Sequence, residues 1–389
     1  MISSYSRRPL RIALIHDWVT GLRGGERVLD ALASHFPEAE LHTLIYRPGR
    51  TTPSIDQLRV FTSRLDRLPG IDRHYRKLLP LYPWAAGQLH PTECDLVISI
   101  SHAIAKSIHI PPETPHLCYC LTPMRYIWDQ ADAYLGTGVR RGLAKPLISA
   151  LRNFDRNHSQ PEQVTRFTSI SREVSRRIQA HYGRPSEVVH PPVNVERFQI
   201  RSGPPEDFYL LVGAFVPYKR EALAIEAFRR NGRRLVVAGD GPLKESLRRQ
   251  SPPNVEFVGR VSDEALADLM SRCRALIHPQ HEDFGIVAVE AQAAGRPVIA
   301  YGAGGALDTV RPLSLDEPHE PSTSEEPTGI FFSEQTPQAL ESAIRIFENN
   351  AGRFQPTAIR RQAQAFGRDR FLIEFDQEIQ KTLDAKTPD

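Results

Sequence analysis

The sequence contains few of the features that would assign it to a secreted or membrane-spanning class. Its 389 residues include four cysteines, with no Cys-x-x-Cys pair and no spacing typical of a secreted disulfide framework: Cys94, Cys118, Cys120 and Cys273. We therefore expect reduced thiols in the core of a cytoplasmic protein. No stretch approaches the roughly 18 consecutive apolar residues of a membrane span, and the apolar run after Arg8 is too short for a signal peptide.

Charge of one sign and metal-binding motifs are also scarce. The 49 basic and 46 acidic residues leave a formal net charge of +3, which is too small to indicate a nucleic-acid partner. No Asp-x-Asp triplet occurs, so we expect no divalent metal held in that way, and we predict no cofactor. With 40% hydrophobic residues the composition is that of an ordinary globular protein, and the length predicts two domains of about 100–200 residues each.

The main positive signal is a repeated alternation of short apolar strands and amphipathic helices. Strands are predicted at 11–16, 40–46, 95–100, 116–120 and 165–171, and again at 209–212, 234–238, 255–258, 275–277 and 296–300. Such alternation indicates an α/β protein with two Rossmann-like, doubly wound parallel sheets. The proline-rich stretch VVHPPVN places the boundary near Pro191, giving domains 1–190 and 191–369. Residues 312–328, acidic and rich in proline, are predicted to form a surface loop.

In the second half, charged residues and glycines follow the predicted strands. Lys219 and Arg220 come after strand 209–212, where a lysine and an arginine could clamp a diphosphate. The loop before helix 285–294 and the glycine-rich loop 302–305 would aim backbone N–H groups at an anion. Glu282 and Glu290, eight positions apart, suit hydroxyl groups of a sugar and a ribose. A buried strand–helix unit with a solvated Glu282 is the alternative.

In the first half, Gly24 and Gly25 lie in a predicted loop after strand 11–16, where they would let a ligand approach the backbone closely. The alternative is a tight structural turn. His102 and Arg125 follow strands 95–100 and 116–120, at the carboxyl edge where α/β sheets bind ligands. We predict that they contact an acceptor or a sugar, although a histidine at a strand end is as often simply solvated.

The segment HEDFGIVAVEAQAAGRPVIA, with its Glu282-x7-Glu290 spacing, resembles the nucleotide-sugar signature of retaining glycosyltransferases with the GT-B fold. The resemblance implies two Rossmann-like domains facing a cleft. It also implies that Glu282 contacts the donor sugar or phosphates, that Glu290 holds the ribose hydroxyls, and that amides at Phe284, Gly285 and Ile286 line the transferred sugar. It implies attack on the same face of the sugar, and a final helix, 370–389, that crosses back onto the first domain.

Three further segments extend this resemblance: HDWVTGLRGGERVL, CYCLTPMRYIWD and VGAFVPYKRE. They are similar to bacterial polysaccharide mannosyltransferases, which implies GDP-mannose as donor, with a UDP-sugar left open, and a lipid-linked or saccharide acceptor. Two positions depart from the family pattern. Leu121 replaces a histidine and Ala214 replaces an arginine. Lys219 and Glu282 remain as predicted catalytic residues, and His102 is our candidate to replace the histidine.

Arg64 to Trp84 mixes basic residues with leucine, tyrosine and tryptophan, a composition that suits the surface of an anionic membrane. The alternative is an amphipathic segment packed on its own sheet. We therefore expect a cytoplasmic protein with peripheral contact to the inner membrane face. A sugar-nucleotide epimerase and a non-catalytic nucleotide-sugar binding subunit remain alternatives to the transferase, because the same cleft would serve all three.

Overall fold

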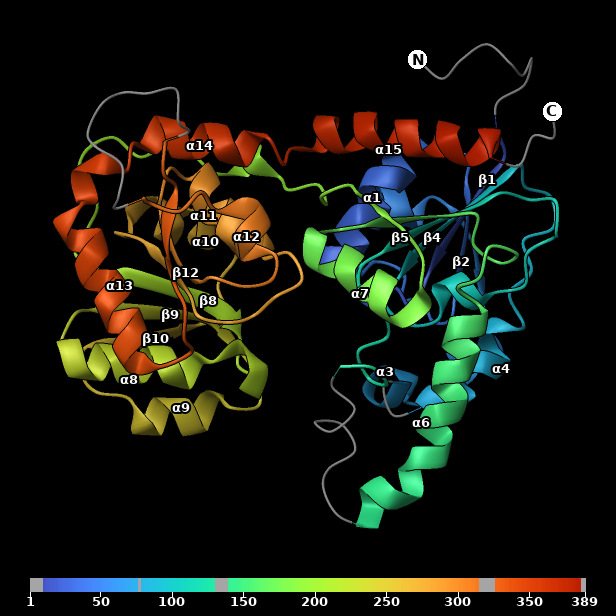
Figure 1. Cartoon of the computed structure of the whole chain (residues 1–389), viewed down its shortest axis with the longest axis horizontal. Helices are drawn as coiled ribbons and strands as arrows, with labels where there is room; N and C mark the ends of the chain where they lie inside the picture. Colours follow the sequence, from blue (N-terminus) through green and yellow to red (C-terminus); the bar gives the residue numbers. More distant parts are fainter. Residues whose placement is uncertain (1–9, 76–77, 130–138, 315–325, 386–389) are drawn as a thin grey trace. The chain divides into compact units, whose positions relative to one another are not determined.

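The computed structural model describes residues 10–75, 78–129, 139–314 and 326–385 (Figure 1). Contacts divide the chain into two compact units, with divisions between Pro192 and Val193 and between Arg368 and Asp369. Each unit is built on one parallel β-sheet with helices packed against it. The predicted α/β class with two parallel sheets is therefore confirmed.

The first sheet has seven strands in the order β3-β2-β1-β4-β5-β6-β7. Its central strands are short apolar runs buried on both faces, as expected for a parallel sheet covered by helices. The strands are β1 Ile12–His16, β2 Glu40–Thr43, β3 Arg59–Thr62, β4 Leu96–Ser101, β5 His116–Cys120, β6 Arg166–Ser169 and β7 Glu187–Val188.

The second sheet has six strands in the order β10-β9-β8-β11-β12-β13. They are β8 Tyr209–Ala214, β9 Leu235–Asp240, β10 Val255–Gly259, β11 Leu276–His278, β12 Val298–Tyr301 and β13 Gly329–Phe332. In both sheets the strand order reverses beside the first strand, between β1 and β4 and between β8 and β11. Open α/β sheets bind ligands at the carboxyl ends of strands that flank such a reversal.

The helices of the first unit pack against its sheet and cover the apolar residues of the strands. They are α1 Gly24–His35, α2 Pro53–Asp56, α3 Ile71–His74, α4 Tyr82–Ala86, α6 Val139–Asn157, α7 Arg172–Tyr182 and α15 Arg368–Asp384. Sequence signals fix the bounds of α7. The Ser171 side chain accepts a hydrogen bond from the Val174 N–H at its start, and Gly183 at φ +69° ends it.

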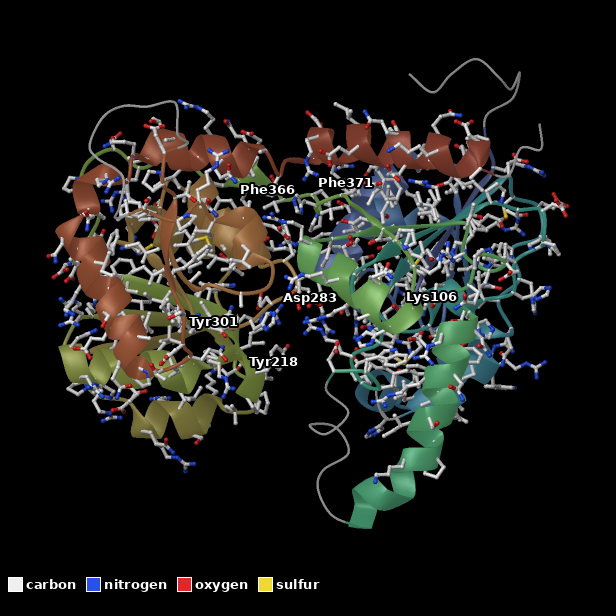
Figure 2. All side chains as sticks on the ribbon, viewed as in Figure 1. Lys106, Tyr218, Asp283, Tyr301, Phe366 and Phe371 are labelled. Carbon is white, nitrogen blue, oxygen red and sulfur yellow. The ribbon has the colours of Figure 1, made fainter. Side chains whose placement is uncertain are left out.

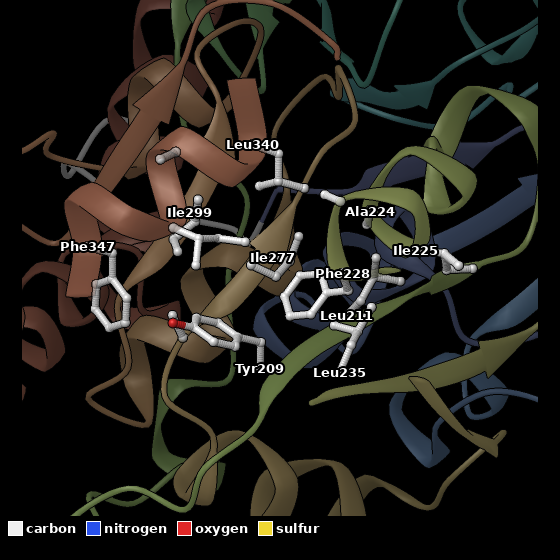
Figure 3. Close-up of a cluster of buried hydrophobic side chains, with 14 of the residues drawn as sticks. Tyr209, Leu211, Ala224, Ile225, Phe228, Leu235, Ile277, Ile299, Leu340 and Phe347 are labelled. Carbon is white, nitrogen blue, oxygen red and sulfur yellow. The ribbon is translucent and has the colours of Figure 1, made fainter. Parts of the chain in front are cut away.

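The helices of the second unit enclose a core built on β8. They are α8 Glu221–Asn231, α9 Lys244–Gln250, α10 Asp263–Arg272, α11 Ile286–Ala293, α12 Ala306–Thr309, α13 Pro337–Asn349 and α14 Pro356–Gln364. Figure 3 shows the aromatic centre of this core. The Tyr209 ring meets Phe228 of α8 edge-on at 5.4 Å and Phe347 of α13 at 6.1 Å between centroids.

The last helix, α15, belongs to the first unit (Figure 1). Its Phe371, labelled in Figure 2, and Phe375 lie edge-on to Tyr119 of β5, with centroids 5.7 and 5.6 Å apart. Glu378 accepts a hydrogen bond of 3.0 Å from Arg166 of β6. Burial of these two phenylalanines holds the helix against the sheet at about 2 kcal/mol or more for each side chain.

Several sequence-based expectations need correction. Helix α1 begins at Gly24, so Gly24 and Gly25 form its first turn rather than a loop. Helix α6 was not predicted. The short strands β3, β7 and β13 were also missed, because none carries an extended apolar alternation. Of the predicted loop 312–328, residues 315–325 lie outside the described residues.

Candidate active site

In the first unit, a buried carboxylate at the end of β1 holds the histidine that follows β4. Asp17 accepts hydrogen bonds from the backbone N–H groups of His102, Ala103, Ile104 and Ala105, at 2.7, 3.0, 2.5 and 2.7 Å. Its Oδ2 also lies 2.8 Å from His102 Nδ1. The two residues stand on either side of the strand reversal, at the ligand-binding edge of the sheet.

This arrangement orients the His102 ring. Burial alone would raise the pKa of Asp17, but the charge and hydrogen bonds of His102 hold that pKa well below its ordinary value. The Asp17 carboxylate faces Nδ1 of His102, which leaves Nε2 as the ring nitrogen available to a ligand. The His102 side chain is 23% exposed and meets the Trp18 ring edge-on at 4.5 Å. Asp17 was missed from the sequence, although it directly follows a predicted strand.

Gly25 allows a close approach between α1 and two strand ends. A Cβ at this position would lie 2.8 Å from Leu121 Cδ1 and 3.0 Å from His16 Nε2. Glycine at this position thus admits these neighbouring side chains, and its predicted contact with the donor stays a prediction. Burial lowers the pKa of His16, which keeps that ring neutral. Leu121, where a histidine was expected, lies one strand away from His102, because Ser101 and Cys120 are paired across β4 and β5.

Arg125 lies in a charged cluster beyond the end of β5. Its charge, with that of Arg177, acts on Asp129, whose carboxylate lies 3.2 Å from His181 Nε2. The pKa of Asp129 is lowered first by the His181 hydrogen bond and then by the two arginines, against the effect of burial. The structure thus gives Arg125 an acidic neighbour, and its predicted contact with a sugar or acceptor stays a prediction.

In the second unit, the structure brings Lys219 and Glu282 together. Lys219 ends a short 3-10 helix, Pro217–Lys219, after β8, and Glu282 lies in the loop after β11, the neighbouring strand. Lys219 Nζ and Glu282 Oε1 form an ion pair. Their sequence neighbours Tyr218 and Asp283 are labelled in Figure 2. Two predicted catalytic residues from distant parts of the sequence therefore meet at the strand reversal of the second sheet.

Arg220 has a different environment from Lys219. Its φ of +59° makes it the only non-glycine residue with positive φ among those described. Its side chain is exposed and lines a hollow of about 210 Å³ with Glu221, Leu243 and Gln335. Burial raises the pKa of Glu221 to about 7, although the hydrogen bond from its own backbone N–H and the charge of Lys219 act to lower that pKa. The carboxyl of Glu221 is therefore largely protonated until the pH approaches neutrality.

The loop before α11 and the glycine-rich loop 302–305 are joined by backbone contacts. Gly305 donates its N–H to the Glu282 carbonyl at 2.8 Å, and Glu282 pairs with Gly304 in an isolated parallel bridge. A side chain at Gly304, which has φ +65°, would run into the Glu282 carbonyl. Gly285, with φ +85°, precedes the first turn of α11. The loops thus support one another and leave the start of α11 facing the carboxyl edge of the sheet.

The remaining predicted donor residues lie on α11 and its entry. Phe284 is buried, with its ring 5.7 Å from that of Phe366, and Ile286 is the first residue of the helix. Glu290 is also buried and accepts a hydrogen bond of 3.1 Å from Arg197, which pairs with Asp263 as well. Arg197 was missed from the sequence. Arg197 thus gives the Glu290 carboxylate a cationic partner.

No group of three or more histidine, cysteine, aspartate or glutamate side chains in the described part of the chain is arranged to hold a metal ion. None of its helices is both long and apolar enough to cross a membrane.

The pair of parallel sheets, each with candidate ligand residues at its strand reversal, defines the class of fold. The Anabaena protein HepE, solved in complex with UDP and glucose, is similar with a TM-score of 0.65 at 17% identity, covering 97% of this chain and 100% of that one. The lipopolysaccharide outer core galactosyltransferase WaaB has a TM-score of 0.64 at 16% identity, covering 96% and 99%. The chain has the GT-B fold of glycosyltransferases.

Residues 193–366 match the model of the family "Glycosyl transferases group 1". The chain is 27% identical over 192 residues to O-antigen chain mannosyltransferase C of Escherichia coli, over 47% of this chain and 48% of the relative. It is 40% identical over 103 residues to the GDP-mannose-dependent alpha-mannosyltransferase of Mycolicibacterium smegmatis, over 26% and 27%. It thus spans about half the length of the first relative and about a quarter of the second.

Proposed function

We propose that the chain is a retaining hexosyltransferase that moves mannose from GDP-mannose to a hydroxyl of a lipid-linked or polysaccharide-precursor acceptor. The observation that carries this proposal is the meeting of Lys219 and Glu282 beside the two glycine-rich loops, within the part of the chain that matches the group 1 family model. The mannosyltransferase relatives support mannose as the sugar. UDP in HepE keeps a UDP-sugar as the alternative donor.

The reaction needs charge stabilisation at the departing diphosphate. In our proposal Lys219 and the backbone N–H groups at the start of α11 meet that charge, so no metal ion is required. The bond from the anomeric carbon to the diphosphate oxygen breaks, and a bond from that carbon to the acceptor oxygen forms on the same face. The acceptor proton passes to the departing phosphate oxygen. Glu282 accepts a hydrogen bond from a sugar hydroxyl.

The proposal is tested by calorimetry and turnover with GDP, UDP, GDP-mannose and UDP-glucose. We expect GDP and GDP-mannose to bind most tightly, and GDP-mannose to be slowly hydrolysed in the absence of acceptor. Deuterium entering the sugar in heavy water would indicate an epimerase instead. Binding with neither hydrolysis nor transfer to any acceptor would indicate a non-catalytic binding subunit. No binding of any of the four compounds would refute the proposal.

A sharper prediction concerns Glu290. Glu290→Gln is expected to weaken GDP binding by about 1–3 kcal/mol, because the variant loses a charged hydrogen bond to the ribose hydroxyls. The matched control is Asp263→Asn, since Asp263 is the other acidic partner of Arg197. If Glu290 acts only by holding Arg197, both variants will weaken GDP binding equally. Equal affinity in wild type and Glu290→Gln would remove Glu290 from the ribose site.

The proposal also includes peripheral contact with an anionic membrane through part of the segment Arg64–Trp84. Its Leu65, Ile71, Tyr75 and Tyr82 are core residues, so the packing alternative holds for these four side chains. Exposed residues of the same segment support the membrane alternative, with both apolar and basic side chains: Leu68, Leu81, Trp84, Arg64 and Arg67. Arg76 and Lys77 lie outside the described residues.

We expect the protein to sediment with vesicles containing phosphatidylglycerol and to be released by salt, because each arginine near such a surface contributes about 1 kcal/mol. Trp84→Ser combined with Arg64→Gln and Arg67→Gln is expected to abolish sedimentation. Ile373→Ser is the control, because Ile373 of α15 is 62% exposed, compared with 53% for Trp84. Failure of the wild type to bind these vesicles at low salt would leave only the packing role.

A further inference from the structure

Three side chains, those of His278, Gln280 and Glu282, lie next to one another at the end of β11 and in the loop that follows it. Gln280 Nε2 lies 3.0 Å from His278 Nδ1 and donates to Glu282 Oε1 at 3.3 Å. His278 Nε2 lies 4.0 Å from Glu282 Oε2, beyond hydrogen-bond range. The predicted strand 275–277 stopped one residue before His278. His278 is the last residue of β11 and is only 1% exposed.

The chemistry of these groups fixes the position of the histidine proton. The Glu282 carboxylate can only accept, so the Gln280 amide must turn its NH₂ group toward it. That same NH₂ group also faces His278 Nδ1, which must therefore be the bare, accepting nitrogen. The proton of a neutral ring then sits on Nε2. Burial, followed by the charge of Lys219, lowers the pKa of His278 to about 3, so the ring stays neutral.

The His278 Nε2–H is buried and has no hydrogen-bond partner within the described part of the chain. A buried donor without a partner is costly, which suggests that it acquires one in the working state. It faces Gly285, where a Cβ would lie 3.1 Å from His278 Nε2 and 3.8 Å from Glu282 Oε2. Glycine at this position keeps open the space between the imidazole and the carboxylate.

Lys219 pairs with Glu282 in the structure and is also the proposed partner of the donor diphosphate. If Lys219 meets the diphosphate of the donor, as in the proposed function, Glu282 loses its cationic partner. We propose that His278 and Gln280 are positioning residues that then hold Glu282, with the Gln280 amide on Oε1 and the His278 Nε2–H on Oε2. The remaining lone pairs of the carboxylate are thereby directed at a hydroxyl of the transferred sugar. This inference rests on the proposed function.

Neutral donors suit this role. A fixed second cation would bind Glu282 strongly whether or not the donor was present, and would compete for the diphosphate. A neutral imidazole and an amide orient the carboxylate at lower interaction energy, so Lys219 remains the group that exchanges partners. This role of His278 and Gln280 accounts for the unpartnered Nε2–H, for the Gln280 contacts with both His278 and Glu282, and for the glycine at position 285.

The test uses His278→Phe and Gln280→Leu, which remove the two donors separately. Both are expected to lower kcat about tenfold to a hundredfold, as for a misplaced sugar contact, while leaving the Kd for GDP unchanged. The ratio of the Kd for GDP to the Kd for GDP-mannose, which reports the affinity contributed by the sugar, should fall in parallel. Gln335→Leu is the matched control, because Gln335 donates to the Pro279 carbonyl of the same loop. It should keep wild-type turnover.

A double-variant cycle separates positioning from a general structural effect. In the Glu282→Gln background, His278→Phe is expected to cause no further loss of sugar-dependent affinity, because it acts through Glu282. Additive losses, or wild-type turnover in both single variants, would overturn the inference. If His278→Phe does not fold, as judged by its melting curve, Gln280→Leu decides alone. Failure of the wild type to bind any nucleotide or nucleotide sugar would refute the proposed function instead.

Discussion

Replacement of Lys219 by methionine is expected to lower kcat for sugar transfer about a hundredfold or more. The loss of one preorganised cation from a departing charge typically has this effect. Methionine keeps the length and apolar volume of the lysine stem, so the loss reports on the charge. Because Lys219 also pairs with Glu282, the variant leaves that carboxylate with Gln280 as its described hydrogen-bond donor.

The comparison variant for Lys219 is Arg220→Met. Arg220 follows Lys219 in sequence but lines a hollow whose lining includes neither Lys219 nor Glu282. Single-turnover measurements with saturating GDP-mannose separate chemistry from product release. If Lys219→Met keeps near-normal turnover while Arg220→Met is inactive, the diphosphate clamp is assigned to the wrong residue.

Replacement of His102 by alanine is expected to lower transfer by about a hundredfold, within the range of 10²–10⁴ for a positioned acid–base group. The imidazole is oriented by Asp17, which holds Nδ1 and leaves Nε2 available. Nε2 is therefore the ring nitrogen that can form a hydrogen bond with a sugar or acceptor hydroxyl. The measurement is the initial rate of transfer, with thermal melting as the check on folding.

Leu121→His provides the matching rescue experiment. Positions 102 and 121 directly follow residues paired across β4 and β5, so both lie at the same edge of the first sheet. A histidine at 121 would stand beside Gly25 and His16. If His102 has taken over the role expected of a histidine at 121, then Leu121→His will restore part of the activity lost in His102→Ala. A fully active His102→Ala would end the hypothesis.

The parts of the fold that depend on periodicity were predictable from the sequence. Ten of the strands are apolar runs flanked by polar or glycine-rich turns, and their alternation with helices led to two parallel sheets. The missed strands show the limit of this reasoning. Strand β3 lies at the sheet edge with no fully buried residue, and β7 has only two residues. Whether such short segments pair as strands depends on the neighbouring strands of the sheet, and the periodicity of the segment itself carries no information about them.

Three candidate site residues were predicted because they lie in the segments that follow strands at the carboxyl edges of the sheets. They are His102 after β4, Lys219 after β8 and Glu282 after β11. Asp17 and Arg197 were missed because their significance lies in partners far along the chain, 85 positions for Asp17 to His102 and 93 for Arg197 to Glu290. The His278 tautomer was also beyond prediction, since it depends on the direction of one amide. Spacing identifies the edge of a sheet, whereas hydrogen bonds between distant residues require coordinates.

The return of α15 to the first unit has a consequence for how the protein can be divided and rebuilt. The second unit, from Val193 to Arg368, is one uninterrupted insertion, whereas the first unit is assembled from both ends of the chain. The two crossings run side by side, because the Val193 N–H donates to the Phe366 carbonyl at 2.9 Å. The inserted unit is therefore the natural module to exchange between relatives in a chimaera, with a joint at each crossing. A first unit expressed alone would need a short loop from Pro192 to Asp369 to retain the aromatic residues that cover its sheet.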